Sequence, residues 1–175
     1  MVVGGISGAG KTTFAARLAE RRGLRHVEVD ALAHGPRWQR RPTFVADVEA
    51  ATRGDGWVAD ALGYDEVNDL LWQRCDTFVW LDYNRGMVMA RVLRRSVARL
   101  TYDRELWNGN RERLADWARP DHPLRWAWDQ LGPRRQEVEA RLAAGAGASA
   151  PTVVRLSTPA AARRWLAALE PGPRP

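Results

Sequence analysis

Short apolar runs alternate with longer segments of helical spacing along this chain. Runs of β-branched and aromatic residues predict strands, and apolar residues that recur every three or four positions predict amphipathic helices. The expected strands are Val2–Gly4, Arg25–Val29, Trp57–Ala59, Thr77–Leu81 and Thr152–Leu156. The expected helices are Thr12–Arg22, Thr43–Thr52, Asp65–Arg74, Arg85–Leu100, Leu124–Ala144 and Pro159–Leu169. Because Gly132-Pro133 lies inside the segment 124–144, we expect that helix to kink or split.

This alternation of strands and helices predicts an α/β fold. Helical crossovers join parallel strands, so we expect a doubly wound parallel sheet with helices on both faces. Ligands of such sheets bind at the carboxyl ends of the strands. That rule directs attention to Gly5–Thr13, Asp30, Asp60 and Asp82–Asn84.

Two segments show no period of either kind. Residues 101–124 are polar and rich in tryptophan and arginine, and we interpret them as a mobile insert that forms a lid. Ala144–Pro151 consists mainly of small residues and is interpreted as a linker. A chain of 175 residues is long enough for one hydrophobic core and too short for two, so residues 1–175 are expected to form a single domain.

The composition is typical of a globular protein, with 45% hydrophobic and 27% charged residues. No apolar run approaches the ~20 residues of a membrane helix, and the first strand begins too early for a signal peptide, so no membrane association is expected. Cys75, the single cysteine, excludes an internal disulfide and favours a reducing cytoplasm. We interpret its thiol as a buried small hydrophobic group. For the oligomeric state, we expect a monomer or a homodimer.

The net charge of +6 indicates an anionic partner, for which nucleic acid and phosphorylated small molecules are both candidates. Arginine supplies every basic side chain except one, Lys11. Nine tryptophans are many for this length, and those in loop-like stretches, such as Trp38, are candidates to line a ligand site.

The lone lysine belongs to a motif with a clear chemical purpose. Gly5–Thr12 reads GISGAGKT and matches the phosphate-binding pattern G-x-x-x-x-G-K-[ST] between a strand and a helix. Backbone N–H groups of such a loop surround phosphates, the lysine ammonium reaches the β- and γ-phosphates, and the Thr12 hydroxyl ligates Mg²⁺. The motif therefore predicts ATP and Mg²⁺ as cofactors, without separating adenine from guanine. The expected nucleotide-binding residues are Gly5, Ser7, Gly8, Ala9, Gly10, Lys11, Thr12 and Thr13.

Carboxylates at strand ends are the next candidates. Asp60 ends the third strand and is expected to hold Mg²⁺ with Thr12, the alternative being a turn or helix-capping aspartate. Asp30 ends the second strand, where it can deprotonate an acceptor hydroxyl or bind it without taking the proton. We assign His34, Trp38 and Tyr64 to the acceptor pocket, although His34 also fits an ordinary loop histidine.

Two arginines follow the fourth strand on one face of a helix. Arg91 and Arg95 are four residues apart, so both guanidinium groups project to the same side. There they can clamp the transferring phosphoryl group and stabilise the charge of the transition state. An exposed basic helix face is the alternative interpretation.

Together these stretches resemble adenylate-kinase-like P-loop proteins, most closely the group labelled "DNA topology modulation protein". The stretches that carry the resemblance are Gly5–Thr13, Val29–Leu32, Trp57–Asp60, Trp80–Asp82 and Arg91–Arg95. The resemblance implies a five-stranded parallel sheet of order 2-3-1-4-5, a short lid and ATP-dependent phosphotransfer. It also implies a Mg²⁺ role for Asp60, and lid arginines nine and thirteen residues after Asp82, which are Arg91 and Arg95. Adenylate kinases continue the strand-three aspartate with Gly-Phe-Pro-Arg, whereas this chain continues with Ala61-Leu62-Gly63-Tyr64, so AMP is not the expected acceptor.

The expected function is transfer of the γ-phosphate of Mg-ATP to a hydroxyl or phosphate of a small-molecule acceptor. A nucleotide or nucleoside kinase is the alternative within this reaction class. An ATP-regulated nucleic-acid-binding protein is the alternative from another class, motivated by the basic charge and the aromatic-rich insert. Nucleic acid is the less expected partner, because Asp30 and Asp60 repel a phosphate backbone.

Overall fold

The computed structural model describes residues 1–61, 63–101, 122–144 and 150–172. The predicted lid insert, 101–124, lies almost wholly outside these ranges, as does most of the predicted linker, 144–151.

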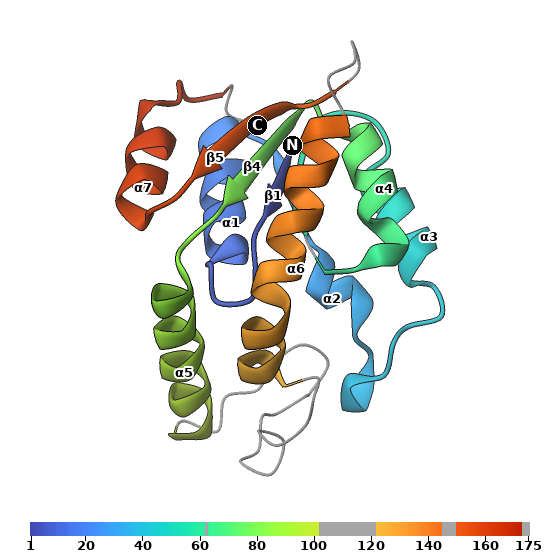
Figure 1. Cartoon of the computed structure of the whole chain (residues 1–175). Helices are drawn as coiled ribbons and strands as arrows, with labels where there is room; N and C mark the ends of the chain where they lie inside the picture. The colour runs from blue at the N-terminus through green and yellow to red at the C-terminus, as the bar shows by residue number, and fades with distance from the viewer. Residues whose placement is uncertain (62, 102–121, 145–149, 173–175) are drawn as a thin grey trace.

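Five parallel strands form one central sheet (Figure 1). The strands are β1 (Val2–Gly4), β2 (Arg25–Glu28), β3 (Trp57–Asp60), β4 (Thr77–Leu81) and β5 (Thr152–Leu156). Their order is β2-β3-β1-β4-β5, and every neighbouring pair is parallel. The predicted fold class and strand order are therefore confirmed.

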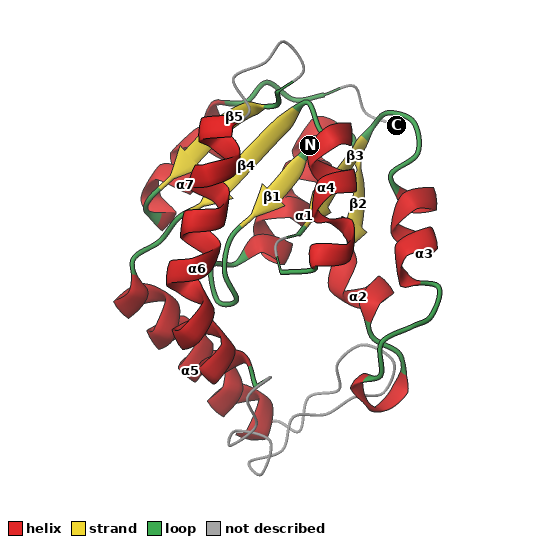
Figure 2. Ribbon diagram, turned by 45° about the vertical axis from the view of Figure 1, so that its right-hand side comes forward, coloured by secondary structure: helices red, strands yellow, loops and turns green. Residues whose placement is uncertain are grey.

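Helices cover both faces of the sheet (Figures 1 and 2). The helices are α1 (Lys11–Arg22), α2 (Val29–Ala33), α3 (Phe44–Ala51), α4 (Asp65–Arg74), α5 (Arg85–Thr101), α6 (Pro123–Ala144) and α7 (Pro159–Ala168), with a short 3₁₀ turn at Pro36–Trp38. Helices α1 and α7 pack on one face, and α3, α4 and the second half of α6 pack on the other. Helix α5 and the first half of α6 extend beyond the carboxyl ends of the strands (Figure 1).

The two faces follow from alternation within strands that are buried on both sides. In β1, Val3 joins the core cluster beneath α1 and α7, whereas Val2 joins the cluster beneath α3 and α4. In β3, Val58 points to the first cluster and its neighbours Trp57 and Ala59 to the second. Successive side chains of a strand point to opposite faces, so a nearly continuous apolar strand fills two cores at once.

The second strand is one residue shorter than predicted and is followed by a helix that the pattern did not reveal. The β2–β3 ladder ends at the pair Glu28 and Asp60. The next backbone amide, that of Val29, donates to the Asp60 side chain at 3.0 Å instead of to a neighbouring strand. The chain then turns into α2, so Asp30 lies in the first turn of a helix and not at a strand end.

Two further predictions concern α6 and Cys75. Helix α6 runs as one element from Pro123 to Ala144 with Pro133 inside it, so of the predicted kink or split at Gly132-Pro133 the split does not occur. Proline removes one N–H from the helix, while packing of α6 against the core and α5 holds the turns on either side. The interpretation of Cys75 as a buried small group is confirmed: it is 5% exposed, and burial raises the pKa of its thiol to about 11.

None of the helices in the described ranges has the combination of length and apolar character that crossing a bilayer requires.

Candidate functional site

The glycine-rich loop, residues 5–10, connects β1 to α1 at the carboxyl edge of the sheet. It closes on itself through a hydrogen bond from the Ala9 amide to the Ile6 carbonyl at 3.0 Å. Gly10 precedes α1 with φ of 89°, a left-handed conformation that glycine adopts without strain. The first turn of α1 carries no acidic side chain, and Gly10 provides no side-chain cap. The positive end of the α1 dipole and its free amides are therefore available to an anion.

Gly8 brings this loop into direct contact with α5. Its φ is +86°, and a Cβ atom there would lie 2.4 Å from Val92 Cγ2 and 3.0 Å from the Val88 carbonyl oxygen. Only glycine permits this approach without a shift of the helix. The loop and α5 therefore form one packed unit.

The predicted arginine pair reaches the loop from α5. Arg91 Nη1 donates to the Ala9 carbonyl at 3.2 Å, and Arg95 Nη2 donates to Ser7 Oγ at 3.0 Å. Arg91 also lies over the ring of Tyr83, 5.3 Å from its centroid. Both arginines are half-buried at the rim of the loop, which favours a phosphate-binding role over a solvated basic helix face.

Asp60 lies directly beside the loop, because β3 pairs with β1 and places it opposite Val3. Its side chain is 2% exposed, and Oδ1 accepts the Val29 amide at 3.0 Å. His26 Nε2 lies 3.9 Å from the same oxygen. Burial raises the pKa of the Asp60 carboxyl, while interactions with the Thr12 hydroxyl and the Val29 amide lower it. Oδ2 is buried and has no hydrogen bond of ordinary geometry within the described residues.

These groups fit a magnesium ion. The free Oδ2 of Asp60 and the Thr12 hydroxyl at the start of α1 are oxygen donors, which Mg²⁺ prefers. In the described ranges no group of three or more histidine, cysteine and acidic side chains could hold a metal. Mg²⁺ at nucleotide sites does not require one, because it uses one or two protein oxygens together with substrate phosphates and water.

Lys11 is the point at which the separate elements meet. Burial lowers the pKa of its ammonium, Asp30 and Asp60 raise it, and Arg95 lowers it. All three groups are therefore close enough to Lys11 to act on its charge. Three elements (α2, β3 and α5) thus present the predicted site residues to the first residue of α1.

The predicted acceptor residues form a second cluster next to Asp30. The Tyr64 hydroxyl makes a hydrogen bond to Asp30 Oδ1 and lies 3.2 Å from His34 Nε2. The Trp38 ring packs edge-on against His34, with centroids 5.5 Å apart. The structure therefore brings together Asp30, His34, Trp38 and Tyr64, and their role as an acceptor pocket stays a prediction.

The pKa values of Tyr64 and His34 in this cluster are shifted in opposite directions. Burial, the Asp30 charge and the hydrogen bond to Asp30 all raise the pKa of the Tyr64 phenol, so it remains protonated. Burial and Arg40 lower the pKa of the His34 imidazole, against opposite effects of Asp30 and of a hydrogen bond with the Trp38 backbone. The Tyr64 phenol therefore loses its proton less readily than an exposed phenol, and the His34 imidazole gains one less readily than an exposed imidazole.

Arg40 is a member of this region that sequence reasoning missed. Its guanidinium lies over the rings of Phe44 and Tyr64, 4.7 Å from each centroid, and pairs with Glu66 at 3.3 Å. A stacked arginine has no spacing signature, because the rings that it covers come from α3 and from the residue before α4. The one sequence feature that could indicate stacking of Arg40 is the presence of aromatic residues such as Phe44 and Tyr64.

Asp82, the reference point for the arginine spacing, has a structural role of its own. Its carboxylate pairs with Arg135 of α6 at 2.6 Å and with Arg155 of β5 at 2.6 Å. These pairs tie β4 to β5 and α6. Asp82 therefore stabilises the edge of the sheet, and within the described residues its ion pairs are with these arginines and not with residues of the loop.

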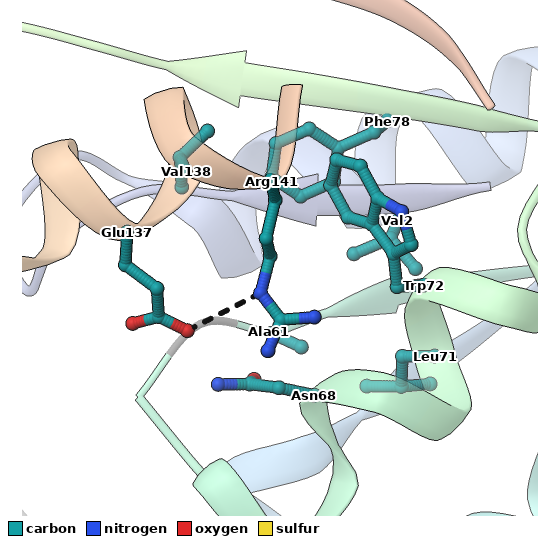
Figure 3. Close-up of a pocket in the computed structure, with 9 residues that line it drawn as sticks. All are labelled: Val2, Ala61, Asn68, Leu71, Trp72, Phe78, Glu137, Val138 and Arg141. Atoms are coloured by element: carbon teal, nitrogen blue, oxygen red, sulfur yellow. Dashed lines mark ion pairs between the residues drawn. The ribbon is translucent and has the colours of Figure 1, made fainter. Parts of the chain in front are cut away.

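A cleft of about 350 Å³, including space open to solvent, lies elsewhere, between α4 and α6 (Figure 3). It is lined mainly by apolar side chains, with Asn68, Glu137 and Arg141 at one side. Arg141 pairs with Glu137 at 3.4 Å and with Asp69 at 2.7 Å. None of the predicted site residues lines this cleft.

The Asp60 carboxylate gives a direct test of the metal site. Replacing Asp60 by asparagine is expected to lower the affinity for Mg²⁺ or the Mg²⁺-dependent activity by about 10–100-fold, the usual cost of losing a group that orients a bound metal. Folding is expected to persist, since the asparagine oxygen can still accept the Val29 amide. Isothermal titration of Mg-ATP and circular dichroism measure the two effects. An unchanged Mg²⁺ dependence in the folded variant would contradict the assignment.

Comparison with known proteins places the fold. No protein-family model matches the chain, and no curated protein sequence matches it. Among solved structures, a gluconokinase from Sinorhizobium meliloti 1021 is similar at a TM-score of 0.51 and 17% identity, over 95% of this chain and 90% of that one. An unliganded sugar kinase from Janibacter sp. HTCC2649 is similar at a TM-score of 0.46 and 20% identity, over 95% of this chain and 91% of that one. At these identities the likeness concerns the fold: this chain has the fold of P-loop kinases.

Proposed function

We propose that this protein is a Mg-ATP-dependent phosphotransferase that moves the γ-phosphoryl group to a hydroxyl of a small-molecule acceptor. The observation that carries the proposal is the convergence at Lys11. A phosphate-binding lysine, a buried carboxylate suited to Mg²⁺ and a second carboxylate on the acceptor side act on one another's charges. A site that only bound nucleotide would have no need of the second carboxylate.

On the donor side, the loop amides and Lys11 would hold the phosphates. When bound, Mg²⁺ would neutralise charge on the β- and γ-phosphate oxygens, held by Thr12 and Asp60. Arg91 and Arg95 already lie at the rim of the loop, where their guanidinium groups can follow charge onto the equatorial oxygens of the transferring group. Positioning and charge stabilisation supply most of the catalysis in this reaction class.

On the acceptor side, Asp30 would take the proton of the attacking hydroxyl. The acceptor oxygen forms a bond to the γ-phosphorus, the bond from that phosphorus to the β–γ bridging oxygen breaks, and ADP leaves with the electron pair. A hydroxyl acceptor suits this carboxylate better than a phosphate acceptor, which is already anionic and would be repelled by Asp30. The residues of the predicted insert, 101–124, are proposed to cover the reacting groups and exclude water.

The finer assignments are also proposals. The resemblance to adenylate-kinase-like proteins and the single-domain, cytoplasmic character remain predictions from the sequence. One similar solved structure is that of a gluconokinase, and for this reason polyhydroxylated acceptors are included in the test. A nucleoside is an alternative acceptor of the same reaction class.

The test is phosphoryl transfer from [γ-³²P]ATP to a panel of sugars, sugar acids, nucleosides and nucleoside monophosphates. Replacing Asp30 by asparagine is expected to lower kcat for a hydroxyl acceptor by about 10²–10⁴-fold, the range for loss of a general base. ATP affinity, measured by titration calorimetry, is expected to change much less than kcat, because Asp30 is not among the residues that would hold the phosphates. The proposal fails if no acceptor in the panel is phosphorylated while salt-sensitive DNA binding is observed.

A further inference from the structure

The hydrogen-bonded chain His34–Tyr64–Asp30 crosses from the aromatic loop to the acceptor side of the site. Its two links are the Tyr64 hydroxyl to Asp30 Oδ1 and the 3.2 Å contact between that hydroxyl and His34 Nε2. Sequence reasoning assigned His34 and Tyr64 to the substrate. In the structure, however, the polar atom of Tyr64 faces two protein groups.

The number of available protons determines which group donates in each hydrogen bond of this chain. A phenol has one proton to donate, and an ionised carboxylate can only accept. The Tyr64 proton is therefore committed to Asp30 when Asp30 is an ionised base. The contact with His34 is then a hydrogen bond only if Nε2 carries a proton, so Tyr64 competes with the Trp38 backbone for the single N–H of a neutral imidazole.

The Tyr64 ring is held in place independently of its hydroxyl. It lies 5.3 Å from the Phe44 ring and beneath the Arg40 guanidinium, which Glu66 holds in turn. Burial keeps the phenol protonated, so it donates to Asp30 instead of repelling it. Tyr64 is thus a rigid donor aimed at one oxygen of a carboxylate.

We infer that His34 and Tyr64 are positioning residues that fix Asp30 through a donor chain, His34 Nε2–H to Tyr64 and Tyr64 O–H to Asp30 Oδ1. This inference rests on the proposed function of Asp30. The chain engages Oδ1 and leaves Oδ2 for the acceptor hydroxyl. It also compensates for the setting of Asp30 in the short helix α2, which alone would allow the carboxylate several rotamers.

Kinetics distinguish positioning from substrate binding. Tyr64→Phe removes only the hydroxyl, and we expect kcat to fall by about tenfold while the KM for the acceptor stays unchanged. This loss is smaller than the ~10²–10⁴-fold contribution of a general base, because Asp30 itself remains. His34→Leu is expected to have the same effect. His34→Gln, whose amide N–H can replace Nε2–H, is expected to retain most of the activity. The double variant Tyr64→Phe/His34→Leu is expected to fall no further than either single one, because both interrupt one chain.

Thr43→Ala is the matched control. It also removes a hydroxyl that donates to a carboxylate, Thr43 Oγ1 to Asp47 Oδ2 at 2.8 Å, but on the exposed start of α3. Its kcat and KM are expected to equal those of the unaltered protein. A rise of KM alone in Tyr64→Phe would show that Tyr64 binds substrate and would overturn the inference, as would an unchanged kcat.

A second measurement needs no acceptor and therefore separates this inference from the proposed function. The protein has three histidines, so the ¹⁵N signals of His34 can be assigned by comparison with one variant that lacks His34. We expect a protonated Nε2 at neutral pH, and loss of that preference in Tyr64→Phe. An unprotonated Nε2 in the unaltered protein would overturn the inference. If Nε2 is protonated but no acceptor is ever phosphorylated, the donor chain stands and the proposed function fails.

Discussion

Replacing Lys11 by alanine is expected to lower the rate of phosphoryl transfer by about 10²–10³-fold, the usual effect of deleting one preorganised charge donor from a transition state. Lys11 begins α1, where the helix dipole, the loop amides and its own ammonium would bind the same phosphate. No other lysine exists in the chain to substitute for it. The rate is measured by steady-state kinetics with an acceptor from the panel that the unaltered protein phosphorylates.

Lys11→Arg is expected to restore little of that activity. An arginine keeps the charge but presents a planar fork, whereas a compact ammonium fits between two phosphate groups. Arg17→Ala is the control, since Arg17 is an exposed cation on the same helix. An active Lys11→Ala variant, or an Arg17→Ala variant that loses as much activity, would contradict the assignment.

The single lysine also allows a chemical test of nucleotide binding. In a protein of residues 1–175, an acylating reagent can modify Lys11 and the amine of Met1, which donates to the Trp57 carbonyl and pairs with Asp76. Burial lowers the pKa of the Lys11 ammonium, so a larger share is unprotonated and reactive at neutral pH. Mg-ATP is expected to protect Lys11 and to leave the N-terminal amine reactive. Mass spectrometry counts both, and equal labelling of Lys11 with and without Mg-ATP would contradict the predicted phosphate site.

Gly8→Ala is expected to be the most disruptive small substitution in the loop. The new Cβ would lie 2.4 Å from Val92 Cγ2, in a residue whose φ is +86°. The left-handed backbone costs about 1–2 kcal/mol for a residue with a side chain. Overpacking against α5 adds about 1–3 kcal/mol. Relief of the clash moves α5, and with it Arg91 and Arg95, so activity is expected to fall by about a hundredfold.

Gly54→Ala separates these two costs. Gly54 has φ of +72°, and a Cβ there would meet nothing within 4 Å. This variant is expected to lose only the backbone part of the stability and none of the activity. In Gly8→Ala, a second change, Val92→Ala, removes the nearest clashing atom and is expected to restore part of both losses. Urea unfolding gives the free energies, and equal losses in Gly8→Ala and Gly54→Ala would show that contact with α5 is unimportant.

Sequence patterns were informative where one segment carries the whole signal. Residues 5–12 hold the loop glycines, the lysine and the threonine within eight positions, so the phosphate site can be predicted without knowledge of the fold. Strands β1, β3 and β4 can be predicted because they are mainly apolar, whereas β2 has only Val27 as an apolar residue. The four-residue spacing of Arg91 and Arg95 places both on one helix face, whichever partner that face meets.

Patterns failed where an element depends on a distant partner. Helix α2 has only five residues, too few for a period to emerge, and it begins where the Asp60 side chain captures the Val29 amide. Residue Pro133 is a helix breaker by local rules, yet α6 continues through it because the surrounding turns are packed. Arg40 joins the site through stacking on two rings from other elements.

The class of fold and the strand order could thus be predicted from the sequence and its resemblance, and the donor half of the site is predicted from residues 5–12. The tertiary structure was needed to find the hydrogen bond between the Tyr64 hydroxyl and Asp30, and the contacts of Arg91 and Arg95 with the loop at Ala9 and Ser7. The physical reason is the range of the interactions. Loop conformation and helix periodicity are local and appear in consecutive residues, whereas hydrogen bonds between residues 30 or more positions apart depend on how the sheet brings its elements together.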